Sequence, residues 1–224
     1  MKSITVKRKV KLKSFLILLL LLAIIGFSLY MYSNMRVRNI YVTGNNYVKE
    51  SELLNSTKLI DYPKLSEVSV KNITKELLNN PWVKDVHVHK SLLGKITIEI
   101  KENKPLYYNL AGNIVLSNGA IIEDDLKLLL PYQKNEIRTD IYEKFLKAFI
   151  NVNQDILVKI SEIEYKASEL DNERFLLYMI DGNYVYITLS KINLLNSYNE
   201  IYPTLEGKKG ILHLDSGNHF EIKE

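Results

Sequence analysis

Two histidines have a spacing that zinc ligands can have. His87 and His89 alternate with valines, so a strand would present both imidazoles on one face. The chain has no cysteine, and a third ligand would have to come from His213, His219 or a distant carboxylate. The same alternation is typical of the exposed face of a hairpin, and we favour that interpretation over a metal site.

The acidic run 123–125 and Ser216 are the other candidates for catalysis. Adjacent carboxylates can bind a cation or act as an acid and base pair, but this run follows Gly119 in a segment typical of a solvated turn. Ser216 lies between Asp215 and Gly217 without the G-x-S-x-G frame of a nucleophilic serine, and no S-x-x-K motif occurs. No glycine-rich phosphate-binding loop is present. The sequence therefore predicts no catalytic residue, no cofactor-binding residue and no metal site.

An apolar run near the N-terminus is the element around which the chain is organised. Ser14–Tyr32 holds 19 residues with no charge and no proline. At ~1.5 Å rise per residue, a helix of this length nearly crosses the ~30 Å hydrocarbon core of a bilayer. We therefore predict a transmembrane helix over residues 14–33, in contact with the lipid bilayer. A cleaved signal peptide is the alternative, since Gly26-Phe27-Ser28 offers a small-x-small site, but the apolar run continues past it.

The charge on the two sides of this run predicts its orientation. The tail, residues 1–13, carries six basic residues and no acidic one, whereas only Arg36 and Arg38 closely follow the run. The positive-inside bias places this basic tail in the cytoplasm and the chain from about Asn34 onwards outside the cell membrane. Six of the 30 basic residues lie in the tail, which leaves 24 against 26 acidic residues outside. The external part is therefore slightly acidic, which argues against a nucleic-acid partner.

Residues 36–103 show a strand, helix, helix, strand, strand pattern. The second helix is expected to carry Val70, Ile73, Leu77 and Leu78 on one face and to begin at a Ser66 or Ser69 cap. Two helices over one face of a three-stranded sheet would bury the aliphatic positions. The expected elements are a strand over 37–43, helices over 47–56 and 67–79, and a hairpin of strands over 83–89 and 96–100.

Residues 104–224 contain mainly short strands bounded by turn residues. Asp140 and Glu143 are spaced as a capping box for a helix, and Asp181-Gly182 between two apolar runs is a strong hairpin signal. A short strand is expected at the C-terminal end. The expected elements are strands over 106–110, 114–116, 120–123, 160–165, 175–180 and 184–189, with helices over 141–153 and 191–202, before the final segment 210–220.

Several of these segments together resemble the FtsQ/DivIB family of cell division proteins. They are the N-terminal anchor, the strand end Val42-Thr43-Gly44-Asn45, the segment Pro81-Trp82-Val83-Lys84-Asp85-Val86 and the hairpin end Glu102-Asn103-Lys104-Pro105. Residues 36–103 resemble the POTRA domain of this family, and residues 104–224 resemble the β domain that follows it. The resemblance implies an α+β fold, in which a single transmembrane helix precedes a small β-α-α-β-β POTRA domain and a mainly β domain with two helices. The turn Ser91-Leu92-Leu93-Gly94 departs from the family pattern, where an arginine and a proline are expected.

The resemblance implies a non-enzymatic, single-pass scaffold of the bacterial division machinery at the division septum. Its partners would be membrane-anchored coiled-coil division proteins of the FtsL and DivIC/FtsB types, with indirect support of the septal peptidoglycan synthase. In the family, the C-terminal edge of the β domain receives a strand from the FtsB-type partner. Carried onto the Asp215-Ser216-Gly217 match, this implies that Leu214, Ser216, Gly217 and Phe220 bind the partner. No cofactor is implied.

Two other functions stay open for an anchored chain of this kind. One is a POTRA-bearing component of polypeptide transport or folding, although the chain lacks the ~10-residue alternating strands of a membrane barrel. The other is a membrane-tethered cell-envelope hydrolase, which would need a convergent polar pocket that the sequence does not display.

Overall fold

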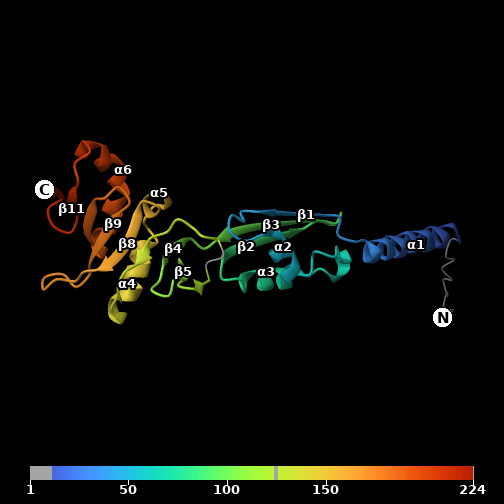
Figure 1. The fold of residues 1–224 in the computed structure, drawn as a ribbon. Helices are drawn as coiled ribbons and strands as arrows, with labels where there is room; N and C mark the ends of the chain where they lie inside the picture. The colour runs from blue at the N-terminus through green and yellow to red at the C-terminus, as the bar shows by residue number, and fades with distance from the viewer. Residues whose placement is uncertain (1–11, 124–125, 224) are drawn as a thin grey trace, which may run out of the picture. The chain divides into compact units, whose positions relative to one another are not determined.

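The computed structural model describes residues 12–123 and 126–223 (Figure 1). It divides into two compact units. The first unit runs to Asn80 and resumes over Asp85–Lys101, and the second holds Pro81–Lys84 and the chain from Glu102 onwards.

Helix α1 (Leu12–Asn34) contains the apolar run predicted to cross a membrane. Its 23 residues include no buried one, and it is the one helix in the described part of the chain that is long and apolar enough for a span. At ~1.5 Å per residue it is about 34 Å long, which exceeds the hydrocarbon core of a bilayer. The helix expected over 14–33 lies wholly within it.

A three-stranded sheet, here called the small sheet, follows α1. Its strands are β1 (Asn39–Thr43), β2 (Val83–Lys90) and β3 (Lys95–Glu102), in the order β1-β3-β2. β1 runs parallel to β3, in a register from Asn39↔Lys95 to Thr43↔Glu99. Ile96, Ile98 and Ile100 alternate with more exposed residues and are buried on one face, as predicted.

Helices α2 (Glu50–Ser56) and α3 (Val70–Leu78) lie on one face of the small sheet, with the short 3-10 helix η1 (Leu65–Glu67) between them in sequence (Figure 1). The hydroxyl of Ser69 caps α3 by accepting a hydrogen bond from the N–H of Asn72 at 3.4 Å. Of the four residues expected on one face, Ile73 and Leu77 are buried and Val70 is half-buried, but the prediction for Leu78 is wrong, because this residue is 47% exposed.

The second unit contains a nine-stranded mixed sheet, here called the large sheet. The strand order is β12-β11-β10-β9-β8-β7-β4-β5-β6, in which β10–β11, β7–β8 and β4–β7 pair in parallel and the other neighbours in antiparallel. The strands are β4 (Pro105–Tyr108), β5 (Ile114–Leu116), β6 (Ile121–Ile122), β7 (Tyr132–Gln133), β8 (Ile160–Tyr165), β9 (Arg174–Met179), β10 (Tyr184–Thr188), β11 (Gly210–His213) and β12 (His219–Ile222). The hairpin predicted at Asp181-Gly182 joins β9 and β10.

Helix α4 (Thr139–Phe149) begins earlier than expected. Asp140 and Glu143 do not form the predicted capping box, because Arg138 is the residue at the N-cap and Asp140 already lies inside the helix. The carboxylate of Asp140 instead accepts hydrogen bonds from Nε and Nη2 of Arg138 at 3.0 and 2.6 Å. A short helix, α5 (Gln154–Leu157), follows.

The helix expected over 191–202 is mostly a 3-10 helix. It consists of η2 (Leu189–Ser197), α6 (Tyr198–Ile201) and η3 (Tyr202–Leu205). Its buried residues Leu189, Ile192 and Leu195 recur at every third position. This spacing matches the three residues per turn of a 3-10 helix, which brings such side chains onto one line.

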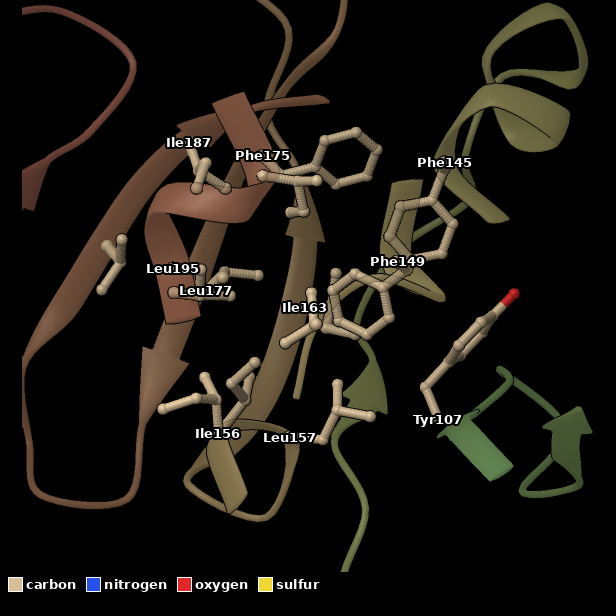
Figure 2. Packing of buried hydrophobic residues seen from close by; sticks show 14 of the residues in the cluster. Tyr107, Phe145, Phe149, Ile156, Leu157, Ile163, Phe175, Leu177, Ile187 and Leu195 are labelled. Atoms are coloured by element: carbon tan, nitrogen blue, oxygen red, sulfur yellow. The ribbon is translucent and has the colours of Figure 1, made fainter. Parts of the chain in front are cut away.

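The core of the second unit lies where α4 packs on the large sheet (Figure 2). The ring of Phe145 stacks on those of Phe149 and Phe175, each with centroids 4.9 Å away, and Tyr107 meets Phe145 edge-on at 5.4 Å. Burial, with the hydrogen bond to the hydroxyl of Tyr142, raises the pKa of Tyr107. The helices and the two sheets together confirm the α+β architecture inferred from the sequence.

Candidate functional site

Strand β12 forms one edge of the large sheet and is the candidate binding element. It pairs antiparallel with β11, in a register from His213↔His219 to Gly210↔Ile222. No other strand of the described residues pairs with its outer side. An edge strand presents backbone N–H and C=O groups with which an extended segment of another chain can pair.

The register determines which backbone groups of β12 point outward. The N–H of Lys223 donates to the carbonyl of Lys209 at 3.0 Å, so these residues form a hydrogen-bonded pair that continues the register. In an antiparallel ladder such residues alternate with residues whose N–H and C=O point away from the partner strand. The N–H and C=O groups of Phe220 and Ile222 therefore face the free edge, where a partner strand would pair with them.

Glycines shape the hairpin that carries this edge. A Cβ atom on Gly210 would lie 2.0 Å from the carbonyl oxygen of Glu221 and 2.9 Å from Cζ of Phe220, so β12 can approach β11 only because no side chain is present there. In the turn, Gly217 and Asn218 have φ angles of +81° and +50°. Glycine and asparagine are the residues that adopt this region most readily.

Asp215 links the turn of the hairpin to other parts of the second unit through hydrogen bonds. Its Oδ2 accepts a hydrogen bond from Nε of Arg174 at 2.6 Å, and the two side chains are only 10% and 21% exposed. Its backbone carbonyl accepts another from Nζ of Lys191 at 2.7 Å. Burial alone would raise the pKa of Asp215, but the hydrogen bond and the positive charge of Arg174 outweigh it and hold this pKa below its usual value.

A stack of side chains runs across β10, β11 and β12. The guanidinium of Arg174 lies 3.6 Å from the centroid of the Tyr186 ring, and Tyr186 stacks on His213 at 5.5 Å. His213 in turn stacks on His219, with centroids 4.6 Å apart and planes at 5°. Nε2 of His213 also lies 3.1 Å from Oε2 of Glu221. The edge strand is thus attached to its neighbours by side chains as well as by backbone hydrogen bonds.

The four residues predicted from the sequence all lie in this hairpin. Leu214 is 3% exposed and packs in the core beneath the turn. Ser216 and Gly217 are exposed in the turn, where the N–H of Ser216 donates to Oδ1 of Asp215 at 2.8 Å. Phe220 is half-buried, because its side chain packs against the core while its backbone faces the free edge.

The structure adds further residues that sequence reasoning missed. Ile222 is 55% exposed on the edge strand, and its apolar side chain among polar neighbours was a signal for it. His213 and His219 become neighbours only through the register of β11 and β12. Arg174 is 41 positions from Asp215, and no local pattern links the two.

The histidines considered as zinc ligands belong to no group of metal ligands in the part of the chain that the structure describes. Within residues 12–123 and 126–223, no three His, Cys, Asp or Glu side chains are grouped so that they could hold a metal ion. His87 and His89 are exposed on β2, and Nε2 of His87 lies 3.6 Å from Oδ2 of Asp85. Asp124 and Asp125 lie outside the described residues.

Comparisons with known proteins match both a family model and curated relatives. The family model of the POTRA domain, FtsQ-type, matches residues 35–103. The chain is 29% identical over 200 residues to the cell division protein DivIB of Bacillus subtilis, a match that covers 83% of this chain and 74% of that protein. It is 26% identical over 207 residues to the cell division protein DivIB of Pediococcus pentosaceus, covering 84% of this chain and 54% of that protein. The match therefore spans about half the length of the Pediococcus protein.

A solved structure is also similar to part of the chain. It is the major extracytoplasmic domain of the trans isomer of the cell division protein DivIB from Geobacillus stearothermophilus. The two are 21% identical, with a TM-score of 0.39, and the likeness covers 47% of this chain and 96% of that one.

Proposed function

Because this chain belongs to the FtsQ/DivIB family of cell division proteins, we propose that it is a non-enzymatic scaffold that binds other membrane proteins of the bacterial divisome. It is a single-pass membrane protein with a POTRA domain and a β-rich domain after its apolar helix. Its partners under this proposal are coiled-coil division proteins of the FtsL and DivIC/FtsB types. Through them it supports the septal peptidoglycan synthase indirectly.

The proposed topology places residues 1–13 in the cytoplasm and residues 14–33 in the membrane. A POTRA domain over 36–103 and a β domain over 104–224 then lie outside, at the division septum. The excess of basic residues before the apolar run supports this orientation.

The observation that carries the proposal is the free backbone of Phe220 and Ile222 on β12. Two residues offer two N–H and two C=O groups, and about 1 kcal/mol for each hydrogen bond gives only about 4 kcal/mol, a millimolar affinity. Backbone pairing alone is therefore too weak to hold a partner. The apolar side chains of Phe220 and Ile222 add contact area, and confinement to one membrane raises the effective concentration of an anchored partner.

The experiment compares the wild-type full-length chain with a Phe220→Ala, Gly217→Glu double variant in dividing cells. Phe220→Ala removes the apolar contact of the edge, and Gly217→Glu places a charged residue at a φ of +81° in the turn. A Leu170→Ala variant is the control, since Leu170 is 100% exposed on another loop. The proposal expects wild type and control to gather at the septum and co-purify with FtsL-type and DivIC-type proteins, and the double variant to lose the DivIC-type protein. An even distribution of the wild type, with no such partners, would overturn the proposal.

A further inference from the structure

The turn between β2 and β3 exposes two adjacent leucines. Leu92 and Leu93 are 73% and 75% exposed. The turn itself is well defined, because the N–H of Ser91 donates to the carbonyl of Lys95 at 2.8 Å and the N–H of Gly94 donates to that of Ser91 at 3.2 Å. Contiguous exposed apolar side chains rimmed by polar residues are a feature of surfaces that contact a membrane or another protein.

The small sheet places this turn beside the segment that follows α1 in sequence. β1 is parallel to β3 with Asn39 opposite Lys95, so the turn before β3 lies beside the start of β1. The N–H of Arg38 donates to the carbonyl of Gly94 at 2.8 Å. α1 ends at Asn34, and four residues at ~3.3 Å each cover at most about 13 Å. The turn is therefore within reach of the lipid headgroups wherever α1 crosses a bilayer.

A second loop reaches the same end of the first unit. The N–H of Val37 donates to the carbonyl of Pro63 at 2.9 Å, and that of Leu65 donates to Met35 at 2.7 Å. This loop also exposes Tyr62, at 46%. A tyrosine with a polar tip and an apolar ring is typical of the membrane interface.

Basic residues lie next to this turn, in the sequence and in the backbone contacts of the small sheet. Arg36, Arg38 and Lys95 are exposed, and none of them forms an ion pair with a carboxylate of the described residues. Nη1 of Arg36 is bound only to the carbonyl of Tyr62 at 3.4 Å, and Nζ of Lys95 lies 4.7 Å from the centroid of the Tyr41 ring. Apolar side chains with adjacent cations match the boundary between acyl chains and anionic headgroups.

We propose that this docking tip, defined as Leu92, Leu93, Arg36, Arg38 and Lys95, binds the surface of an anionic bilayer. The leucines enter the headgroup region, and the three basic side chains contact lipid phosphates. The contact holds the first unit against the membrane that α1 crosses. It depends on the anchor alone and is independent of the partners proposed for β12.

The test uses the absence of cysteine from the chain, which makes an introduced one unique. Leu93→Cys and Leu78→Cys variants of the full-length chain each carry a polarity-sensitive fluorophore in phosphatidylcholine vesicles with about 30% phosphatidylglycerol. Leu78 is also exposed and is the last residue of α3. The chain continues from there to Trp82, whose carbonyl accepts a hydrogen bond from the N–H of Asn103. This pair closes the β2–β3 hairpin at the end opposite its turn. The proposal predicts quenching by headgroup-proximal nitroxide lipids, with a blue shift, at residue 93 and neither at residue 78. Equal, solvent-like signals at both positions would overturn it.

A charge variant separates binding of anionic lipid from other contacts. Arg36→Gln, Arg38→Gln and Lys95→Gln, combined in the Leu93→Cys chain, keep the side-chain stems and remove the charge. The proposal predicts that quenching in phosphatidylglycerol vesicles falls to the level measured in pure phosphatidylcholine. Unchanged quenching would overturn the headgroup contact. A label at residue 93 that is shielded only when a second membrane protein is added would instead identify a protein-binding surface and would also overturn it.

Discussion

Nε of Arg174 on β9 lies 2.6 Å from Oδ2 of Asp215 in the turn between β11 and β12. The same guanidinium covers the ring of Tyr186 at 3.6 Å, and Tyr186 accepts the N–H groups of Leu214 and Asp215 on its backbone carbonyl at 2.9 and 3.1 Å. The position of the turn, and with it the exit of β12, therefore depends on a charged pair between segments far apart in the sequence.

Replacing Asp215 with Asn should loosen this turn. The variant loses the charge-assisted hydrogen bond of a mostly buried pair, and we expect a local destabilisation of about 1–3 kcal/mol. Amide hydrogen exchange at Leu214 measures it. Lys166→Gln is the matched control, because it breaks an ion pair with Glu164 whose lysine is 49% exposed, and it should change exchange at Leu214 little. Equal exchange in Asp215→Asn and wild type would contradict the assigned role of the pair.

The depressed pKa of Asp215 predicts a pH dependence of the same hairpin. Because the folded pKa lies below the ordinary value of 3.8, the carboxylate contributes stability that is fully present well above that pH. This stability is lost as the pH falls through 3.8 towards the folded pKa. Hydrogen exchange or unfolding followed between neutral and acidic pH should therefore show a steeper loss in wild type than in Asp215→Asn. Parallel pH profiles for the two proteins would be the opposite result.

Adding a methyl group at Gly210 should displace β12. The new Cβ would lie 2.0 Å from the carbonyl oxygen of Glu221, so the strands must separate, at a cost of about 1–3 kcal/mol for overpacking. We expect Gly210→Ala to lower the thermal stability and to reduce binding at the edge. Gly207→Ala is the comparison, since nothing lies within 4 Å of its Cβ and only the φ of +79° opposes the substitution. A Gly210→Ala protein with unaltered hairpin protection would show that the close approach is not required.

The aromatic core should be the main source of stability in the second unit. Phe145 is 1% exposed and contacts the rings of Tyr107, Phe149 and Phe175 (Figure 2). Phe145→Ala leaves a cavity, and we expect a loss of about 3–5 kcal/mol in the free energy of unfolding, measured by urea denaturation. Phe145→Leu fills more of the space and should lose less. Similar losses for both variants would argue against a tightly packed ring cluster.

Local signals in the sequence predicted most of the elements. Ile96, Ile98 and Ile100 alternate on a single strand, and Asp181-Gly182 marks a turn whose chemistry is complete within a few residues. The sequence did not predict the 3-10 helix, although Leu189, Ile192 and Leu195 recur at its spacing of three residues. Apolar residues three positions apart also occur on one face of an α-helix, so this spacing did not distinguish the two kinds of helix.

Long-range pairing could not be predicted in the same way. The parallel contact of β10 with β11 and the pair Arg174–Asp215 join segments with no shared local pattern. The capping box failed for a local reason, since Arg138 occupies the N-cap position and its guanidinium binds the carboxylate of Asp140. The candidate edge was located from the resemblance, and only the register shows which backbone groups are free.

Under the proposed function, partners pair with the outward backbone of β12, and Ile222→Pro removes one of the groups that they would use. Proline removes the outward N–H of Ile222, which β11 does not use, and edge strands tolerate proline at such positions. Ile222→Ala shortens the same side chain but keeps the N–H, so it controls for lost apolar contact. We predict that co-purification of the DivIC-type partner with the full-length protein is lost in Ile222→Pro and largely retained in Ile222→Ala. Equal retention of the partner by both variants would contradict strand addition at this edge.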